Sequence, residues 1–374
     1  MNCENNMDVK KISFGKGRFM MLVLSFIMGH CSIHHAVAQT EISQYQPGIT
    51  AEGAVYFLPI TAIQFNILVE KTTYTPGDFA RYAGRHLRLN DVEQEPKTTY
   101  RVVSIVPQGV GIVDTTKAYS VKFNAKTVAA NVALSEEGLL LAINAEPNLF
   151  TPAPPFKPAK KPAAVNPRQY MNEDILSAGS TAKMAELTAR EIYDLRENRN
   201  LLIKGQADFM PTDGAQMQLM LNQMDQQDKA LTQLFQGITE RDTTEHIITI
   251  VPTKSTNRRV LFRLSQVRGL VDIDDLSGEP FYVSIEDITN LPATQQTKGK
   301  KKLVETGIYV NVPGRMLVSI EHKEQTISAT ELPAPQFGNV ELLSGDLFNK
   351  HYTTHLWLNP VSGGVDRLEA EQPK

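Results

Sequence analysis

The clearest pattern of apolar and polar positions lies in the middle of the chain, between residues 172 and 237. Apolar residues recur there at intervals of three and four, which places them on one face of a helix. In the C-terminal half of this stretch they are Met217, Met220, Leu221, Met224, Leu231, Leu234, Phe235 and Ile238. Two helices that each have one apolar face are expected to bury these faces against each other, as an antiparallel hairpin over residues 171–239.

Residues with capping propensity mark the ends of both predicted helices. Ser180 precedes the first helix, and Gly205 can adopt the left-handed conformation that often ends one. Asp213 can cap the second helix, with Gln216 three residues later to complete a capping box, and Gly237 suits its end. The methionines of the second helix suit either a hairpin core or an adaptable binding surface, and the core is the simpler interpretation.

Short runs of alternating apolar and polar residues dominate the rest of the chain and predict strands with one buried face. The N-terminal part, residues 39–148, contains several such runs and one short helix that Asp78 can cap and that extends to about Leu89. The C-terminal part, residues 240–374, contains more runs of the same kind. The sequence therefore predicts an α+β protein, in which two β-rich domains, sandwich- or barrel-like, flank the helical hairpin.

A proline-rich segment, residues 149–170, separates the N-terminal part from the hairpin. Its prolines are Pro152, Pro154, Pro155, Pro158, Pro162 and Pro167. Such a segment is expected to be an extended, semi-rigid spacer, because proline favours neither helix interiors nor paired strands. An alternative is that it serves as a ligand for a partner protein.

A faint pattern is shared by the two β-rich parts. Each contains a short apolar run that leads to a proline, Pro59 or Pro313, and then an alternating run. Later in each part, Gly138 and Gly363 follow similar short apolar segments. The pattern suggests duplication of one β module, in which Pro59 and Pro313 end equivalent strands.

The first 38 residues have the features of an export signal. A basic stretch precedes an apolar run at residues 19–28, and Ala-Val-Ala at residues 36–38 fits a cleavage site. The apolar run is too short to span a bilayer, so residues 1–38 are expected to be a secretory signal peptide. The rest of the chain contains no other segment apolar enough to be a transmembrane span.

Both cysteines, Cys3 and Cys31, lie in the expected signal peptide. The mature chain would therefore have no disulfide, no cysteine nucleophile and no cysteine-ligated metal. Lipidation of Cys31 is a poorer interpretation, because His30 is an unfavourable neighbour for lipoprotein cleavage. A formal net charge of −3 gives no indication of nucleic-acid binding.

No local pattern identifies catalytic, cofactor-binding or metal-binding residues. His351 and His355 have the spacing of zinc ligands on a helix, but this stretch is predicted to be a strand, which would hold them too far apart. An acidic cluster lacks the oxygen ligand and the glycine that a calcium loop requires, and it comprises Asp272, Asp274, Asp275 and Glu279. A hydrolase with two catalytic carboxylates remains an alternative, because acid pairs have no local signature.

A basic helical face is the remaining candidate for binding. Arg81, Arg85 and Arg88 recur at helical spacing beside Tyr82 and His86. An exposed basic face explains them most simply, and a platform for a glycan or another small molecule is the alternative.

Five short stretches resemble a family of exported Bacteroidetes proteins of unknown function, and they cover residues 55–59, 74–83, 192–199, 234–237 and 336–340. The resemblance implies an envelope or secreted protein, and it implies neither an activity nor functional residues. We therefore expect a non-catalytic protein without cofactors, located in the periplasm or at the outer membrane. A partner from the envelope would contact the helical hairpin or a strand edge.

Overall fold

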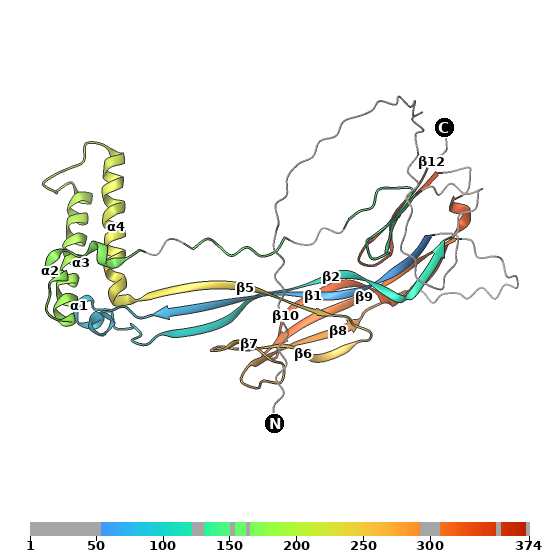
Figure 1. Cartoon of the computed structure of the whole chain (residues 1–374), viewed down its shortest axis with the longest axis horizontal. Helices are drawn as coiled ribbons and strands as arrows, with labels where there is room; N and C mark the ends of the chain where they lie inside the picture. Colours follow the sequence, from blue (N-terminus) through green and yellow to red (C-terminus); the bar gives the residue numbers. More distant parts are fainter. Residues whose placement is uncertain are drawn as a thin grey trace, which may run out of the picture. The chain divides into compact units, whose positions relative to one another are not determined.

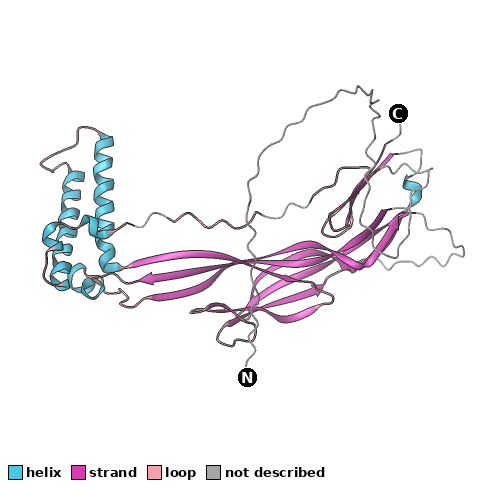
Figure 2. Cartoon of the chain, viewed as in Figure 1, coloured by secondary structure: helices cyan, strands magenta, loops and turns pink. Residues whose placement is uncertain are grey.

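The computed structural model describes residues 54–121, 131–149, 154–161, 165–291, 307–348 and 353–371. The expected signal peptide and both cysteines lie outside these residues. The described chain is rich in strands, which form three sheets, and it contains few helices (Figure 2). The α+β class is therefore confirmed.

The first sheet has three antiparallel strands in the order β2-β1-β5 (Figure 1). These are β1, Ala54–Thr75; β2, Lys97–Val121; and β5, Ile238–Ile250. The alternation expected at residues 63–69 is present, because Ile63, Phe65, Ile67 and Val69 are all buried. β1 pairs with a strand from each side of the helices, so the expected N-terminal and C-terminal parts share this sheet.

The second sheet has the strand order β10-β9-β8-β6-β7, and the third has the order β12-β11-β4-β3. The strands of the second are β6, Thr256–Ser265; β7, Gly269–Val271; β8, Glu279–Asp287; β9, Gly307–His322; and β10, Gln325–Ser344. Those of the third are β3, Val132–Leu134; β4, Leu140–Ile143; β11, Thr353–Leu358; and β12, Val365–Glu371.

The hydrophobic cores also join the two halves of the chain. One core packs β1 residues such as Phe65 against Phe281 of β8 and Val318 of β9. Another packs Leu58 of β1 with Leu356 of β11. The strand pairing and the cores therefore do not follow the expected division into two β-rich domains. The alternating pattern determines which residues face a core, whereas the partner of each strand depends on contacts between distant parts of the chain.

The helical part forms a third core. It comprises η1, Ala80–Tyr82; α1, Ala83–Leu87; η2, Pro167–Tyr170; α2, Glu173–Leu176; α3, Thr181–Lys204; and α4, Gly214–Gln236. A further short helix, η3, covers Gly345–Phe348. Within the proline-rich segment, residues 154–161 adopt neither helix nor strand, whereas Pro167–Tyr170 at its C-terminal end form η2 and are not extended as expected.

The capping signals of the two long helices function as expected. Ser180 accepts a hydrogen bond from the amide of Lys183, and Asp213 accepts one from the amide of Gln216 at 2.7 Å. Gly205 ends α3 with a φ of 69°. The prediction for Asp78 is wrong, because α1 has no side-chain cap and Asp78 instead forms an ion pair with Arg168.

Charged pairs show how α3 and α4 lie against each other. Arg196 pairs with Asp228 at 3.0 Å, and Arg199 pairs with Asp225 at 2.7 Å. The residue number rises by three on α3 while it falls by three on α4, so the helices run in opposite directions. The segment that follows β1 contacts α4 where the amide of Phe79, just before η1, donates to the Leu234 carbonyl at 2.7 Å.

The prolines of the two similar sequence runs occupy comparable places. Pro59 lies in β1 beside a four-residue bulge of β2, residues 114–117. Pro313 lies in β9 beside a four-residue bulge of β10, residues 335–338. The prediction that these prolines end their strands is wrong, because both strands continue past them. Proline lacks an amide donor, so it is tolerated where a bulge interrupts the hydrogen-bond ladder.

Candidate functional site

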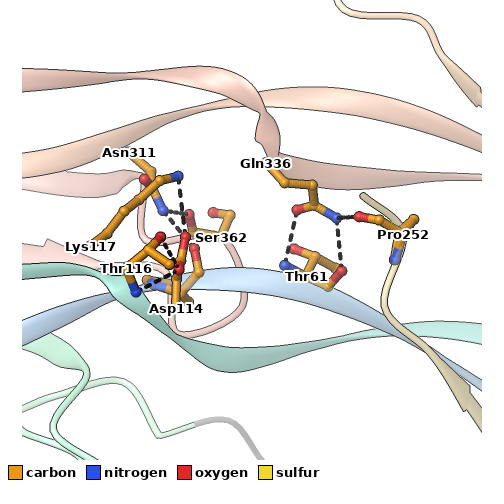
Figure 3. Close-up of polar contacts among 9 residues, drawn as sticks. Thr61, Asp114, Thr116, Lys117, Pro252, Asn311, Gln336 and Ser362 are labelled. Carbon is orange, nitrogen blue, oxygen red and sulfur yellow. Dashed lines mark hydrogen bonds and ion pairs between the residues drawn. The ribbon is translucent and has the colours of Figure 1, made fainter. Parts of the chain in front are cut away.

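The most developed polar cluster lies where β1, the bulges of β2 and β10, and the turn between β11 and β12 meet (Figure 3). Thr61 of β1, Asn311 of β9 and Ser362 of the turn are buried there. Buried polar groups destabilise a fold unless they form hydrogen bonds. The partners of each group therefore decide what this cluster can do.

Gln336 connects three segments through its side-chain amide. Its Oε1 accepts from the amide of Thr61 at 3.1 Å, and its Nε2 donates to the Thr61 carbonyl at 2.9 Å. The same Nε2 donates to the carbonyl of Pro252, just beyond β5, at 3.2 Å (Figure 3). Thr61 lies just past the last β1 residue that pairs with β5, so the Gln336 side chain takes the place of a further β5 residue at this edge of β1.

Asn311 also connects separate segments through its side-chain amide. Its Nδ2 donates to the carbonyls of Pro59 at 2.9 Å and Ser362 at 2.8 Å, and its backbone amide donates to Gly363 at 3.1 Å. Its Oδ1 is buried and has no hydrogen-bond partner among the described residues. The two donor contacts fix the orientation of the amide, so Asn311 acts as a clamp between β1 and the β11–β12 turn.

Asp114 is the carboxylate of this cluster. It accepts from the amide of Thr116 at 3.0 Å and from the hydroxyl at 2.6 Å, and it forms an ion pair with Lys117 at 3.7 Å. Partial burial opposes its ionisation, but the hydrogen bonds from Thr116 and the charge of Lys117 leave its pKa below the usual range. A single carboxylate with its partners in place suits a structural role, and no second described carboxylate converges on it to form an acid pair.

The basic face predicted at Arg81, Arg85 and Arg88 is exposed. These three side chains form no ion pair with other described residues. The rings of Tyr82 and His86 lie 6.3 Å apart in a tilted arrangement, and the Tyr193 hydroxyl donates to the His86 carbonyl. The three arginines therefore lie on a solvated helix face.

Two residues of the acidic cluster, Asp272 and Asp275, line an open hollow of about 400 Å³ together with Arg268, Leu270 and Val271. Asp275 accepts from the amide of Ser277 at 2.9 Å and pairs with Arg268 at 2.9 Å. The hydrogen bonds from Ser277 and the charge of Arg268 lower the pKa of Asp275. A guanidinium already neutralises this carboxylate, so the hollow is poorly suited to a cation.

The remaining predicted candidates are separated in space or lie outside the described chain. Glu279 pairs with Lys323 at 2.9 Å and with His322 at 3.4 Å. His355 lies in a strand, as predicted, and its Nδ1 contacts the carbonyl of Asn144 at 2.5 Å. His351 lies outside the described residues. Within the part of the chain that the structure describes, no group of three or more potential metal ligands is present.

Exposed apolar side chains gather along the sequence near the connection between α3 and α4. Ile203, Phe209 and Leu219 are 55%, 65% and 68% exposed, and Met210 is also exposed. In α4, Leu231, Leu234 and Phe235 are buried, whereas the methionines of its first half are only half-buried. The C-terminal half of α4 therefore contributes to the helical core, whereas its N-terminal half offers apolar surface to solvent.

Sequence reasoning did not single out Gln336, Asn311 or Phe209 as functional. Gln336 and Asn311 are polar residues within strand-like runs, and their importance depends on bulges that have no local signature. Phe209 and Met210 could have been recognised, because two large apolar residues in a turn are unusual.

Comparison with known families finds one family model that matches most of the described chain. The model of a domain of unknown function, DUF4831, matches residues 52–366. The chain belongs to this family. The match includes the helices, the first two sheets and all five stretches that carried the resemblance. No curated protein and no solved structure shows a significant match. None of the described helices has the length and apolar character needed to cross a membrane.

Proposed function

We propose that this DUF4831 protein is an exported, non-catalytic interaction protein of Bacteroidetes, located in the periplasm or at the outer membrane. The features of an export signal in residues 1–38 support the location. We further propose that α3 and α4 act as one hairpin, whose free end contacts a protein partner from the envelope.

The exposed apolar side chains at this end are the observation that carries the proposal. Phe209 and Leu219 each leave more than half of their surface in water. Burying one such side chain against a partner stabilises a complex by about 1.5–3 kcal/mol. Clusters of this kind on a soluble protein commonly mark interaction sites.

The antiparallel ion pairs between α3 and α4 support the role of the helices as a rigid unit. Arg196 and Arg199 hold Asp228 and Asp225 alongside, so these charges are neutralised within the pair. From Gly214 to Met224 the sequence of α4 contains no charged residue. A partner can therefore cover this part of α4 without burying an unpaired charge.

The test is a cross-linked pull-down of the tagged chain from its own cell envelope, followed by mass spectrometry. We expect a stoichiometric partner with cross-links to α3 or α4, and we expect Leu219→Glu to abolish its recovery. Leu276→Glu is the matched control, because Leu276 is also exposed but lies in a loop between β7 and β8. Equal recovery of one partner by both variants would contradict the proposal.

The two alternative functions gain no support from the described geometry. A glycan-binding role required a groove beside Arg81 and Arg88, and these residues lie on a solvated face. A carboxylate-dependent hydrolase required two converging acids, and Asp114 and Asp275 are each paired with a basic residue instead.

A further inference from the structure

The outer edge of β5 has the properties of a pairing site. β5 pairs with β1 from Ile238 to Ile250 without a bulge. No described strand pairs with its other edge, because β5 ends the order of its sheet. The strand contains neither proline nor glycine and is rich in isoleucine and threonine, which favour strands. An edge of this kind presents backbone donors and acceptors that another strand can use.

The register with β1 shows which face each β5 residue occupies. His246 lies opposite Ile67 and Thr244 lies opposite Val69, both of which point into the core shared with the second sheet. Even-numbered residues of β5 therefore share the core side, and odd-numbered residues share the opposite face.

The charges along β5 are complementary to themselves about Thr243. In an antiparallel pair of two β5 strands with Thr243 opposite Thr243, Arg241 of each copy lies opposite Glu245 of the other. Glu240 then lies opposite His246, and no two like charges are directly opposed. Opposite-charge pairs across strands favour pairing, and directly opposed like charges disfavour it.

Other registers fit less well. A slip of one residue would place the core side of one copy against the outer side of the other. A pairing centred on Asp242 would place the two Asp242 carboxylates opposite each other. The pairing centred on Thr243 places Arg241 opposite Glu245 twice, once on each side of the two-fold axis. It also keeps the core side of one copy next to the core side of the other.

We propose that β5 binds β5 of a second copy of this chain, so that the two β2-β1-β5 sheets join into one continuous sheet. This surface is separate from the end of the α3–α4 pair, and its partner is the chain itself. Such an edge-to-edge contact is isologous, because the same residues lie on both sides of a two-fold axis.

The proline-rich segment touches the same strand. The amide of Phe156 donates to Glu245 at 3.2 Å, and Lys161 pairs with Asp242 at 3.7 Å. Both members of the ion pair are about half-exposed, at 55% and 51%, so solvent screens it and its contribution is small. A ladder of backbone hydrogen bonds from a second β5 forms more contacts than these two. A second β5 can therefore displace the proline-rich segment from this edge.

Charge exchange tests the pairing. The chain without residues 1–38 is studied by sedimentation over a range of concentrations, with circular dichroism to verify folding. We expect a dimer, and we expect Arg241→Glu or Glu245→Arg to weaken it about fivefold or more, since each change alters two symmetry-related pairs. The double variant restores opposite charges and should return the dissociation constant to within about twofold of the original.

A disulfide provides a second, site-specific measurement. The chain without residues 1–38 has no cysteine, so Thr243→Cys should form a disulfide-linked dimer on mild oxidation, because residue 243 lies opposite itself. Thr239→Cys is the matched control, because the two copies of residue 239 would lie far apart. A monomer at all concentrations, a dimer that the double variant fails to restore, or equal cross-linking of both cysteine variants would overturn the proposal.

The two proposals fail independently. Leu219→Glu should leave the β5 dimer intact while it removes the envelope partner. A dimer that Leu219→Glu abolishes and the β5 variants do not affect would overturn the pairing of β5 and assign self-association to the helices.

Discussion

The hydroxyl of Tyr56 accepts a hydrogen bond from the amide of Tyr309 at 2.7 Å and donates one to the carbonyl of the same residue at 3.1 Å. A side chain of β1 thus binds the backbone of β9, 253 positions away in the sequence. Burial raises the pKa of Tyr56, so the hydroxyl stays protonated and keeps both contacts. This contact links β1 and β9, the strands that contain Pro59 and Pro313.

Tyr56→Phe should therefore lower the free energy of unfolding by about 1–3 kcal/mol, because it removes the hydroxyl that serves a buried amide and carbonyl. Urea denaturation measures the change. Tyr119→Phe is the control, since the Tyr119 ring stacks on Tyr309 at 4.5 Å but its hydroxyl has no hydrogen-bond partner among the described residues. Equal effects of the two variants would show that the hydrogen bonds of Tyr56 contribute little.

Gly77 lies against the backbone of α4 at the junction of the first sheet and the helices. A Cβ added at this position would lie 2.1 Å from the Leu234 carbonyl oxygen, which cannot move independently of the helix. Gly77→Ala should destabilise the fold by about 1–3 kcal/mol through this overlap. At Gly214 no atom lies within 4 Å of an added Cβ, so Gly214→Ala should be neutral or slightly stabilising. Thermal denaturation of both variants measures the difference. A neutral Gly77→Ala would contradict the close approach.

The lowered pKa of Asp114 predicts a pH-dependent contribution to stability. A carboxyl whose pKa is lower in the folded state stabilises the fold fully above its unfolded pKa of about 3.9, and the contribution is lost as the pH falls through the folded value. The wild-type chain should therefore be more stable than Asp114→Asn at pH 7, and the difference should shrink at about pH 3. Denaturation at both values measures it.

The control for this prediction is Glu136→Gln, because Glu136 is exposed and its side chain forms no hydrogen bond or ion pair with other described residues. It should cause little change at either pH. A difference between Asp114→Asn and wild type that is as large at pH 3 as at pH 7 would show that ionisation of Asp114 does not contribute.

The ends of the long helices could be predicted because their signals are local. Ser180, Gly205 and Asp213 act within three or four residues of their own positions, so the sequence around each contains the necessary information. The pairing of β1 with β5 could not be predicted in this way, because about 160 residues separate the strands. Several alternating runs could pair with each strand equally well. The expected division into two β-rich domains followed from assigning neighbouring runs to each other.

The polar cluster could not be predicted from the sequence for a related reason. Gln336 is important because it lies in a bulge of β10 and binds the backbone of Thr61 in β1, and bulges have no reliable signature in a single sequence. The exposed end of the α3–α4 pair was predicted only in part. Apolar residues recur at helical spacing in both the first and the last turns of α4, so periodicity alone does not show where the core ends.

Two leucines of α4 test where that core ends. Leu231 is 0% exposed and Leu219 is 68% exposed. Leu231→Ala should destabilise the fold by about 2–5 kcal/mol, because it leaves a cavity, whereas Leu219→Ala should change stability by less than about 0.5 kcal/mol. The same Leu219→Ala chain should recover less envelope partner in the pull-down, so that binding is lost while stability is kept. A large loss of stability in Leu219→Ala would mean that this side chain supports the fold itself, and the apolar end of the helix pair would no longer be available to a partner.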